Sequence, residues 1–255
     1  MRSLGIALAF LTRLPTWDPG VLPPEALGPP TRWFPVVGAL IGALIAAVFW
    51  AASLVLPPVV AALLAVAAGV VLTGALHEDG LADLADAAGV RGDAERRQAA
   101  MKDPHLGTFG VLALILTVAL RATALSALGP TLGAGWLVVA HGVSRGAMVL
   151  PLRLASSAGS GLQAAVSRVV RPVDVWLAGT VSVALAVGWL GPWAIAALLI
   201  TALANALPAA WARKRLGGFS GDVLGAGQQL AELGLLLLAV ALVTTGSHPS
   251  VPIWR

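Results

Sequence analysis

The chain has 255 residues, of which 58% are hydrophobic and only 11% are charged, and its mean hydropathy is +0.89. A soluble domain carries about a quarter of charged residues, so this composition predicts a membrane protein. The net charge of +4 is too small and too scattered to indicate a nucleic-acid partner. The chain has no cysteine, which excludes disulfides and thiolate metal sites.

Apolar stretches punctuated by Pro and Gly follow an N-terminal segment, 1–35, that we expect at the membrane interface. Each stretch is close to the length of about 20 residues with which a helix crosses a bilayer. Their predicted ranges are 36–56, 58–76, 108–128, 131–152, 175–190, 193–211 and 223–245. The sequence therefore predicts an all-α polytopic membrane protein, one domain over residues 1–255 with about seven transmembrane helices.

The connections between these predicted spans alternate between two kinds. The tight turns are at 56–59, 128–135 and 190–193, and the long or charged connections are 77–107, 153–174 and 212–222. Thirteen of the sixteen Lys and Arg residues lie on the side of the long connections. By the positive-inside rule that side is cytoplasmic. We therefore expect an inner-membrane protein with its N-terminus inside, its C-terminus outside and its active site on the cytoplasmic face.

The second predicted span runs into the acidic segment "LHEDGLADLADAAGVRGD" at 76–93. In a helix over 78–95, Asp79, Asp83 and Asp86 would fall within about 60° of one another at 100° per residue. Asp93 would join that face if the helix extends so far. Stacked carboxylates repel each other, and Mg²⁺, which prefers hard oxygen ligands, would compensate for this. The alternative is a solvated acidic face at a helix start.

A second motif, "RKRLGGFSGD", occupies residues 213–222, within the predicted Gly-rich cytoplasmic loop at 212–222. Small residues allow backbone N–H groups to approach a phosphate, and a helix start favours an anion. Asp222 could serve the same cation as the acidic segment. The alternative is that the basic residues anchor the membrane boundary and the glycines form a flexible turn.

A third motif is "MKDPHLGTFG" at 101–110. We expect Gly107 and Thr108 to cap the next span. For Lys102 and Asp103, a contact with phosphate or metal and a surface ion pair both remain open.

Together these motifs resemble a known family. "GALHEDGLADLADA", "MKDPHLGTFG" and "GGFSGDVLGA", in this order and with these spacings, resemble the cobalamin synthase family, the adenosylcobinamide-GDP ribazoletransferases. "FLTRLP" at 10–15 and "RWFPVVGALIG" at 32–42 are similar to that family's N-terminal pattern. The resemblance spans residue 10 to about residue 233. One departure is Ser220, which stands where the family pattern has Thr and keeps the hydroxyl.

The resemblance implies a transferase for a late step of cobalamin biosynthesis. A hydroxyl of α-ribazole, or of its 5′-phosphate, attacks the phosphorus attached to cobinamide in adenosylcobinamide-GDP, and GMP leaves. Mg²⁺ is the implied cofactor. The expected partners are these two substrates and the lipid bilayer. Homo-oligomerisation and association with other cobalamin-assembly enzymes both remain open.

The resemblance also implies roles for individual residues. Metal ligands are expected at Asp79, Asp83, Asp86 and Asp222. The attacking hydroxyl would lose its proton to one of the catalytic candidates Asp83, Asp86 and His77. Phosphate contacts are expected from Lys102, Asp103, Gly217, Gly218, Ser220 and Gly221.

Three charged residues lie within the predicted spans: Arg121, Arg145 and Glu232. A charge at such depth is costly and is usually paired or faces a cavity. Arg145 and Glu232 lie at comparable depth, so we expect them to pair and brace the bundle. The alternative is that they line a cleft that admits the corrinoid.

Two other classes of protein remain as alternatives. A CDP-alcohol phosphotransferase of lipid synthesis also has Asp-rich helices that bind Mg²⁺, but its pattern places Ala-Arg shortly after Asp-Gly, and "DGLADLADA" lacks that Arg. A transporter would have polar residues near the bilayer midplane and some loops that form an outer gate. The outer turns predicted for this chain are minimal.

Overall fold

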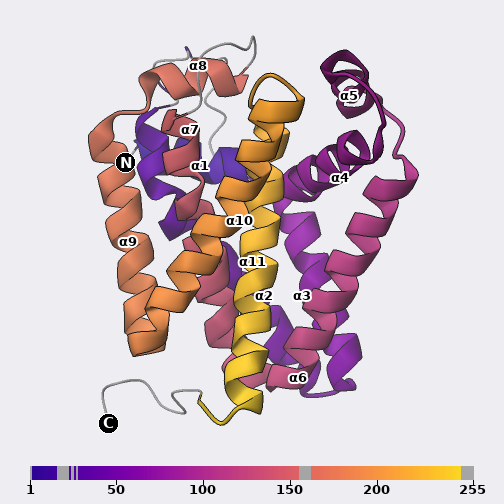
Figure 1. Ribbon diagram of the computed structural model, residues 1–255. Helices are drawn as coiled ribbons and strands as arrows, with labels where there is room; N and C mark the ends of the chain where they lie inside the picture. Colours follow the sequence, from indigo (N-terminus) through magenta and orange to yellow (C-terminus); the bar gives the residue numbers. More distant parts are fainter. Residues whose placement is uncertain (1, 16–22, 24–25, 27, 155–161, 248–255) are drawn as a thin grey trace.

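The computed structural model describes the chain except residues 1, 16–22, 24–25, 27, 155–161 and 248–255, and every regular element in that part is a helix (Figure 1). The α-helices are α1 (Arg2–Leu11), α2 (Phe34–Ser53), α3 (Pro58–Thr73), α4 (Leu76–Gly89), α5 (Ala94–Met101), α6 (Thr108–Ala147), α7 (Val149–Leu154), α8 (Leu162–Val169), α9 (Pro172–Leu190), α10 (Ala194–Arg215) and α11 (Gly221–Thr244). Short 3-10 helices cover Pro29–Trp33 and Gly191–Trp193. The predicted all-helical fold is confirmed.

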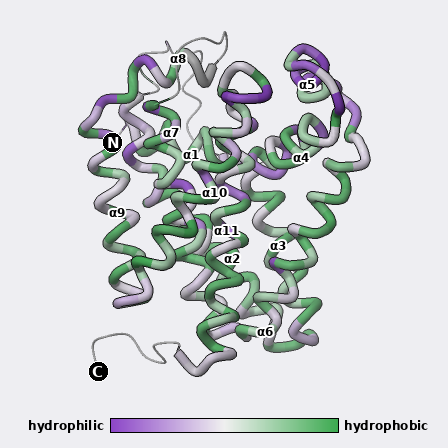
Figure 2. Tube along the Cα trace, viewed as in Figure 1, coloured by the Kyte–Doolittle hydropathy of each residue, from purple (hydrophilic) through white to green (hydrophobic). Residues whose placement is uncertain are grey.

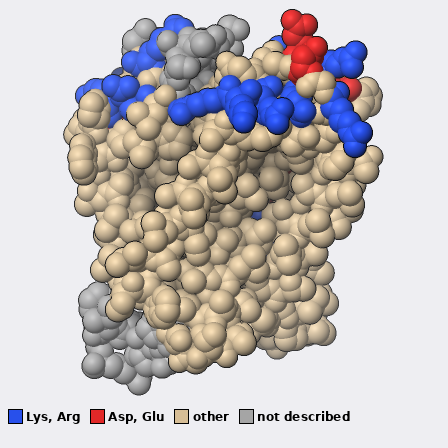
Figure 3. All heavy atoms as spheres, in the orientation of Figure 1, with Lys and Arg blue, Asp and Glu red and all other residues tan. Residues whose placement is uncertain are grey.

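Four helical stretches in the described chain are long and apolar enough to cross a membrane, and they are Pro29–Ser53, Thr108–Leu154, Pro172–Arg215 and Gly221–Thr244. The bent pair of α3 and α4 makes a fifth if it counts as one span. Figure 2 shows these helices as mostly hydrophobic along their length, and Figure 3 shows the charged side chains of the visible face gathered at one end. The chain is therefore a multi-pass membrane protein.

The longest stretch, α6, contains a reversal at Gly129, whose φ of 71° and ψ of 172° are not helical. Arg121 and His141 lie on either side of this residue, and both contact Glu232. In a straight helix their Cα atoms would be roughly 30 Å apart at 1.5 Å per residue, so the chain must fold back between them. A second break occurs at Gly191, between α9 and α10, where φ is 54°. Both breaks lie in the turns predicted at 128–135 and 190–193.

Glycines allow α2 to pack closely on the second half of α6. A Cβ atom at Gly38 would overlap the carbonyl oxygen of His141, and one at Gly42 would overlap that of Leu137. Small residues permit this approach of backbones, which is how helices associate in a membrane without a hydrophobic driving force. The packing places His141 and Arg145 in the centre of the bundle, where both are buried.

The predicted span 58–76 ends early, because Gly74 and Ala75 are both left-handed, with φ values of 66° and 58°. Beyond this break α4 is bent away from α3 by 95°. Figure 1 shows α4 at the end of the bundle where α5 and the α10–α11 connection also lie. The acidic motif is therefore carried on a helix outside the apolar span of α3.

The single helix expected over 78–95 is instead two helices, because α4 ends at Gly89 and α5 begins at Ala94. Asp93 is the N-cap of α5, and its carboxylate accepts the N–H of Arg96 at 3.0 Å. The expectation that Asp93 could share the face of the other acids is therefore wrong. The helix breaks between Gly89 and Gly92 because Gly92 adopts a φ of 149°, which is not a helical conformation.

The Gly-rich connection is shorter than the predicted 212–222, because α10 continues through Arg215. The basic triplet at 213–215 therefore forms the last turn of α10, where cations interact favourably with the helix dipole. Only residues 216–220 separate α10 from α11.

Candidate active site

Helix α4 meets the start of α11 with the two backbones in contact. A Cβ atom added at Gly80 would lie 2.7 Å from the carbonyl oxygen of Asp222 and 2.8 Å from its Cα. One turn further along α11, a Cβ atom at Gly225 would lie 3.3 Å from the Cα of His77. Glycine at these two positions therefore places Asp222 directly beside the acidic helix.

The carboxylates at this junction affect one another. Partial burial raises the pKa of Asp83 to about 6, and the negative charges of Asp79, Asp222 and Asp86 add to this effect. Asp79 is exposed, whereas Asp83 and Asp222 are half-buried. A site with such a concentration of negative charge favours a bound cation.

A pocket of about 460 Å³ lies against this face of α4. Asp79 and Asp83 line it from one side, and Lys102, Asp103 and His105 line it from the segment that leads into α6. The structure thus brings two of the three predicted motifs together. The volume falls in the range of about 300–1,000 Å³ that is usual for small-molecule sites, so the pocket fits one small ligand or part of a larger substrate.

Asp103 interacts with His105 at the rim of this pocket. Its carboxylate accepts the backbone N–H of His105 at 2.9 Å and lies 2.8 Å from the Nδ1 of the same residue. These hydrogen bonds hold the pKa of Asp103 below its usual value. Lys102 is exposed beside them, so its ammonium group is accessible to an anion.

Asp86 has a structural partner that the sequence did not indicate. Its Oδ2 accepts the N–H of Gly107 at 2.8 Å, and its Oδ1 accepts the N–H of Gly110 at 2.8 Å. The expected capping position is confirmed at Gly107, which is the N-cap of α6. The Thr108 side chain does not cap the helix, because the Asp86 carboxylate binds the free amides instead. A side chain at either glycine would overlap that carboxylate. Asp86 therefore joins α4 to α6 and does not line the pocket.

His77 lies on the opposite side of α4 from the pocket. It is 2% exposed, and neither of its ring nitrogens has a hydrogen-bond partner among the described residues. It packs against α11 at Gly225 and is absent from the pocket lining. The structure therefore does not bring His77 together with Asp79 and Asp83.

The Gly-rich connection lies at the same end of the molecule but does not line the pocket. Gly217 is left-handed, with a φ of 69°, and Cβ atoms at Gly217, Gly218 or Gly221 would meet nothing within 4 Å. Ser220 is the N-cap of α11. Helix α5 holds the start of the connection, because Gln98 donates to the carbonyl oxygen of Leu216 at 2.6 Å. The space beside the three glycines is therefore open, whereas Leu216 is buried and Phe219 packs against the core.

The donor set fits Mg²⁺ only together with other ligands. Among the described residues, no three carboxylate or imidazole side chains are placed so that they could hold a metal ion by themselves. Mg²⁺ usually takes one or two carboxylates and completes its shell with water and substrate phosphate. Asp79 and Asp83 in the pocket, with Asp222 beside them, are consistent with that kind of site.

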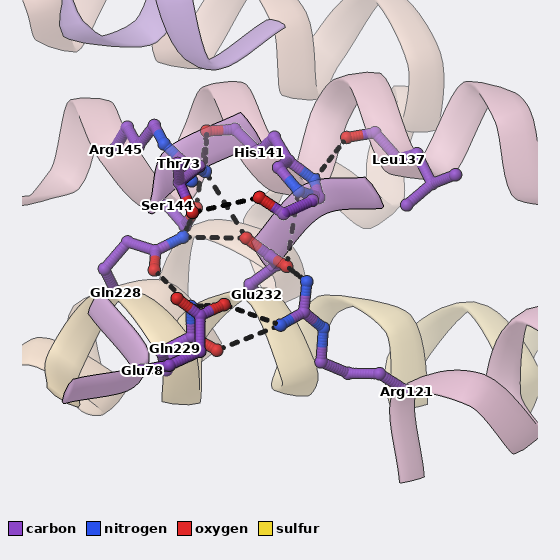
Figure 4. A network of polar contacts seen from close by, with 11 residues as sticks. Thr73, Glu78, Arg121, Leu137, His141, Ser144, Arg145, Gln228, Gln229 and Glu232 are labelled. Atoms are coloured by element: carbon purple, nitrogen blue, oxygen red, sulfur yellow. Dashed lines mark hydrogen bonds and ion pairs between the residues drawn. The ribbon is translucent and has the colours of Figure 1, made fainter. Parts of the chain in front are cut away.

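A buried polar network lies deeper in the bundle and is centred on Glu232 (Figure 4). The carboxylate of Glu232 forms an ion pair with Arg121 and lies 3.4 Å from Nη1 of Arg145 and 3.5 Å from Nε2 of His141. Gln228 donates to it at 2.7 Å. The predicted pairing of Arg145 with Glu232 is confirmed, and Arg121 is a second partner.

The same network reaches the acidic helix through Glu78. Arg121 lies 3.4 Å from Oε1 of Glu78 and donates to the side-chain oxygen of Gln229 at 3.0 Å. Gln229 in turn donates to Glu78 at 3.1 Å. Sequence reasoning missed Glu78, Gln228 and Gln229. The available signal was a pair of amides at 228 and 229, one helical turn before a buried glutamate.

Comparison with known proteins identifies the family of this chain. The profile of the family described as cobalamin-5-phosphate synthase matches residues 3–240. The chain is 42% identical to the adenosylcobinamide-GDP ribazoletransferase of Leptothrix cholodnii over 92% of its length and 94% of that protein. It is 41% identical to the enzyme of the same name from Novosphingobium aromaticivorans, over 97% of this chain and 99% of that one. No solved structure gives a significant match. By the extent of these matches, the chain belongs to the cobalamin-5-phosphate synthase family.

Proposed function

We propose that this protein is an adenosylcobinamide-GDP ribazoletransferase of cobalamin biosynthesis. It joins α-ribazole, or its 5′-phosphate, to adenosylcobinamide-GDP and releases GMP. The main structural support for this function is the pocket between the acidic helix α4 and the 101–106 segment. The chain that forms this pocket matches enzymes of this name over nearly its full length. A pocket of about 460 Å³ would hold the phosphates and the reacting hydroxyl, and most of the corrinoid would lie outside it.

The residues of the pocket suit a phosphoryl transfer, in which the protein mainly positions groups and neutralises charge. Asp79 and Asp83 would hold Mg²⁺ together with water and substrate phosphate, with the negative charge of Asp222 beside them. The bound ion would neutralise charge that develops on the transferred phosphoryl group. Lys102 lies in the same pocket and would bind phosphate oxygens. The loop with Gly217, Gly218, Ser220 and Gly221, outside the pocket, would contact the nucleotide phosphates. Asp103 would contact phosphate from the pocket lining.

Of the three predicted catalytic side chains, Asp83 is the best placed to accept the proton of the attacking hydroxyl. It lines the pocket, where a general base has to lie to reach the proton of the attacking hydroxyl. Asp86 binds backbone amides with both oxygens, and His77 is buried away from the pocket. We assign Asp86 a supporting role and give His77 no direct role.

We also propose seven membrane crossings, with the N-terminus and this pocket in the cytoplasm. The reversals at Gly129 and Gly191 divide two of the long helical stretches, which supports this count. The concentration of Lys and Arg at the end that carries α4 and α5 supports the orientation by the positive-inside rule (Figure 3).

An assay of the purified protein in detergent tests the function. The substrates are adenosylcobinamide-GDP, α-ribazole and Mg²⁺, and GMP and the corrinoid product are followed by mass spectrometry. We expect product from the wild type, none with EDTA, and a rate reduced by about 100-fold or more in Asp83→Asn. Asp93→Asn is the matched control, because this carboxylate caps α5 outside the pocket. A folded protein that ignores these substrates but transfers from a CDP-alcohol, or only binds a solute, would contradict the proposal.

A further inference from the structure

Two consecutive acids of α4 point in different directions. Both line the pocket, but Asp79 is exposed, whereas Glu78 is buried and also contacts Arg121 and Gln229. Successive residues of a helix are about 100° apart, so Asp79 lies on the exposed side of α4 while Glu78, at the buried edge of the pocket, reaches the interior. Glu78 therefore connects the pocket helix to the interior of the bundle.

Helix α4 needs such a connection because its start has little local support. It follows two left-handed residues, Gly74 and Ala75, and no side chain caps its N-terminus. The contact of Gly80 with Asp222 holds α4 against α11, and Asp86 holds its last turns on α6. The polar contacts of the first turn with α6 and α11 are those of Glu78.

The charges of the network balance. Glu78 and Glu232 contribute two negative charges, and Arg121 and Arg145 contribute two positive charges. Glu232 is fully buried, and the two arginines are 3% and 2% exposed. Removal of one partner from a buried ion pair leaves the other charge uncompensated, and this is far less favourable than removal of both. The position of Glu78 is thus coupled to the whole network.

We propose that Glu78 is a positioning residue: its ion pair with Arg121 fixes the first turn of α4 and so places Asp79 and Asp83 for metal and phosphate binding. This inference rests on the proposed function. The ion pair requires a carboxylate that faces Arg121. A glutamate at position 229 could supply it, because the side-chain oxygen of Gln229 already lies 3.0 Å from Nη1 of Arg121.

The test measures Mn²⁺ binding by electron paramagnetic resonance on the purified protein in detergent, without substrate. Glu78→Gln should raise the Kd for Mn²⁺ by about tenfold, the lower end of the 10–100-fold loss typical when an outer partner of a metal ligand is removed. The exchange variant Glu78→Gln/Gln229→Glu, which keeps the network neutral, should return the Kd to within about threefold of wild type. Asp174→Asn is the matched control for the loss of a buried, paired carboxylate. Asp174, on α9, is fully buried and forms an ion pair with Arg171, the N-cap of that helix.

Hydrogen exchange of the α4 amides is the second measurement. Glu78→Gln should increase the rate of amide hydrogen exchange over residues 76–89. The double variant Glu78→Gln/Gln229→Glu should return this rate toward that of the wild type. Wild-type Mn²⁺ affinity and wild-type α4 protection in Glu78→Gln would overturn the inference, as would equal losses in Asp174→Asn. If the wild type binds no Mn²⁺, the proposed metal site fails, and unchanged α4 exchange in Glu78→Gln would then overturn the positioning role separately.

Discussion

Gly80 on α4 lies so close to Asp222 on α11 that an added Cβ atom would be 2.7 Å from the Asp222 carbonyl oxygen. The contact is between backbones, so neither side can move a flexible side chain out of the way. It brings the acid at the start of α11 to the acids of α4, although about 140 residues of chain separate them.

Gly80→Ala should therefore displace α4 from α11 and lower transferase activity while most of the bundle remains folded. We expect the loss to appear in the rate and in the Mg²⁺ concentration needed for half-maximal activity, because Asp222 moves away from Asp79 and Asp83. Steady-state assays over a Mg²⁺ series measure both. Gly179→Ala on α9 is the control, since a Cβ atom there also meets nothing within 4 Å. Equal activity of Gly80→Ala and wild type would show that this close approach has no role.

Asp86→Ala should destabilise the protein by removing the acceptor of two backbone N–H groups at the start of α6. A lost helix cap costs about 0.5–2 kcal/mol, and both bonds here are to a carboxylate, so we expect the upper part of that range. Unfolding of the variant and of the wild type in a series of detergent mixtures measures the difference in their free energies of unfolding. Asp86→Asn keeps one acceptor oxygen and should lose less. If Asp86→Ala removed activity with unchanged stability, the capping role would be secondary to a role in the chemistry.

The raised pKa of Asp83 predicts a pH dependence of stability in metal-free protein. Since the folded-state pKa of about 6 lies above the ordinary value of 3.8, the folded protein binds the proton more tightly than the unfolded chain does. Stability should therefore decrease as the pH rises from about 4 to about 6 and stay low above it. Thermal unfolding in EDTA at several pH values measures this.

Asp83→Asn should remove much of that pH dependence and raise the Tm of the metal-free protein at pH 7, although the variant is inactive. Residues that crowd like charges for function commonly reduce stability in this way. Mg²⁺ should flatten the dependence in the wild type, because a cation favours the ionised carboxylate. A Tm of Asp83→Asn below that of the wild type at pH 7 would contradict this account.

Glu232→Gln should be among the most destabilising single changes in the molecule. It leaves Arg121 and Arg145 buried without their shared carboxylate, and loss of one partner from a buried pair costs about 3–5 kcal/mol. We expect a low yield of folded protein in membranes. Glu232→Gln combined with Arg145→Met should recover part of the yield, whereas additive losses in the double variant would exclude coupling between the two side chains.

The proposed orientation can be measured directly because the chain has no cysteine of its own. Ala99→Cys on α5 should react with a membrane-impermeant maleimide only after the membrane is opened. Ser53→Cys at the end of α2 should react in intact cells. The reverse pattern would invert the orientation and place the acidic pocket outside the cytoplasm.

A helical membrane protein with its charges at one end could be predicted from the amino-acid sequence, because the length of the apolar stretches and the distribution of Lys and Arg can be read along the chain. The turns at Gly129 and Gly191 could also be located, because Gly and Pro act locally. The acidic motif could be recognised without coordinates, since so few other carboxylates occur in the chain.

Which of these residues contact one another depends on how the helices pack. Asp86 binds the amides of Gly107 and Gly110 because two helices cross there, and no helical periodicity within α4 distinguishes it from Asp83. Glu78 faces Arg121 rather than water because α4 bends by 95° after Gly74 and Ala75. Such roles depend on distances between segments far apart in the chain, and a side chain's own type and neighbours in sequence do not contain them.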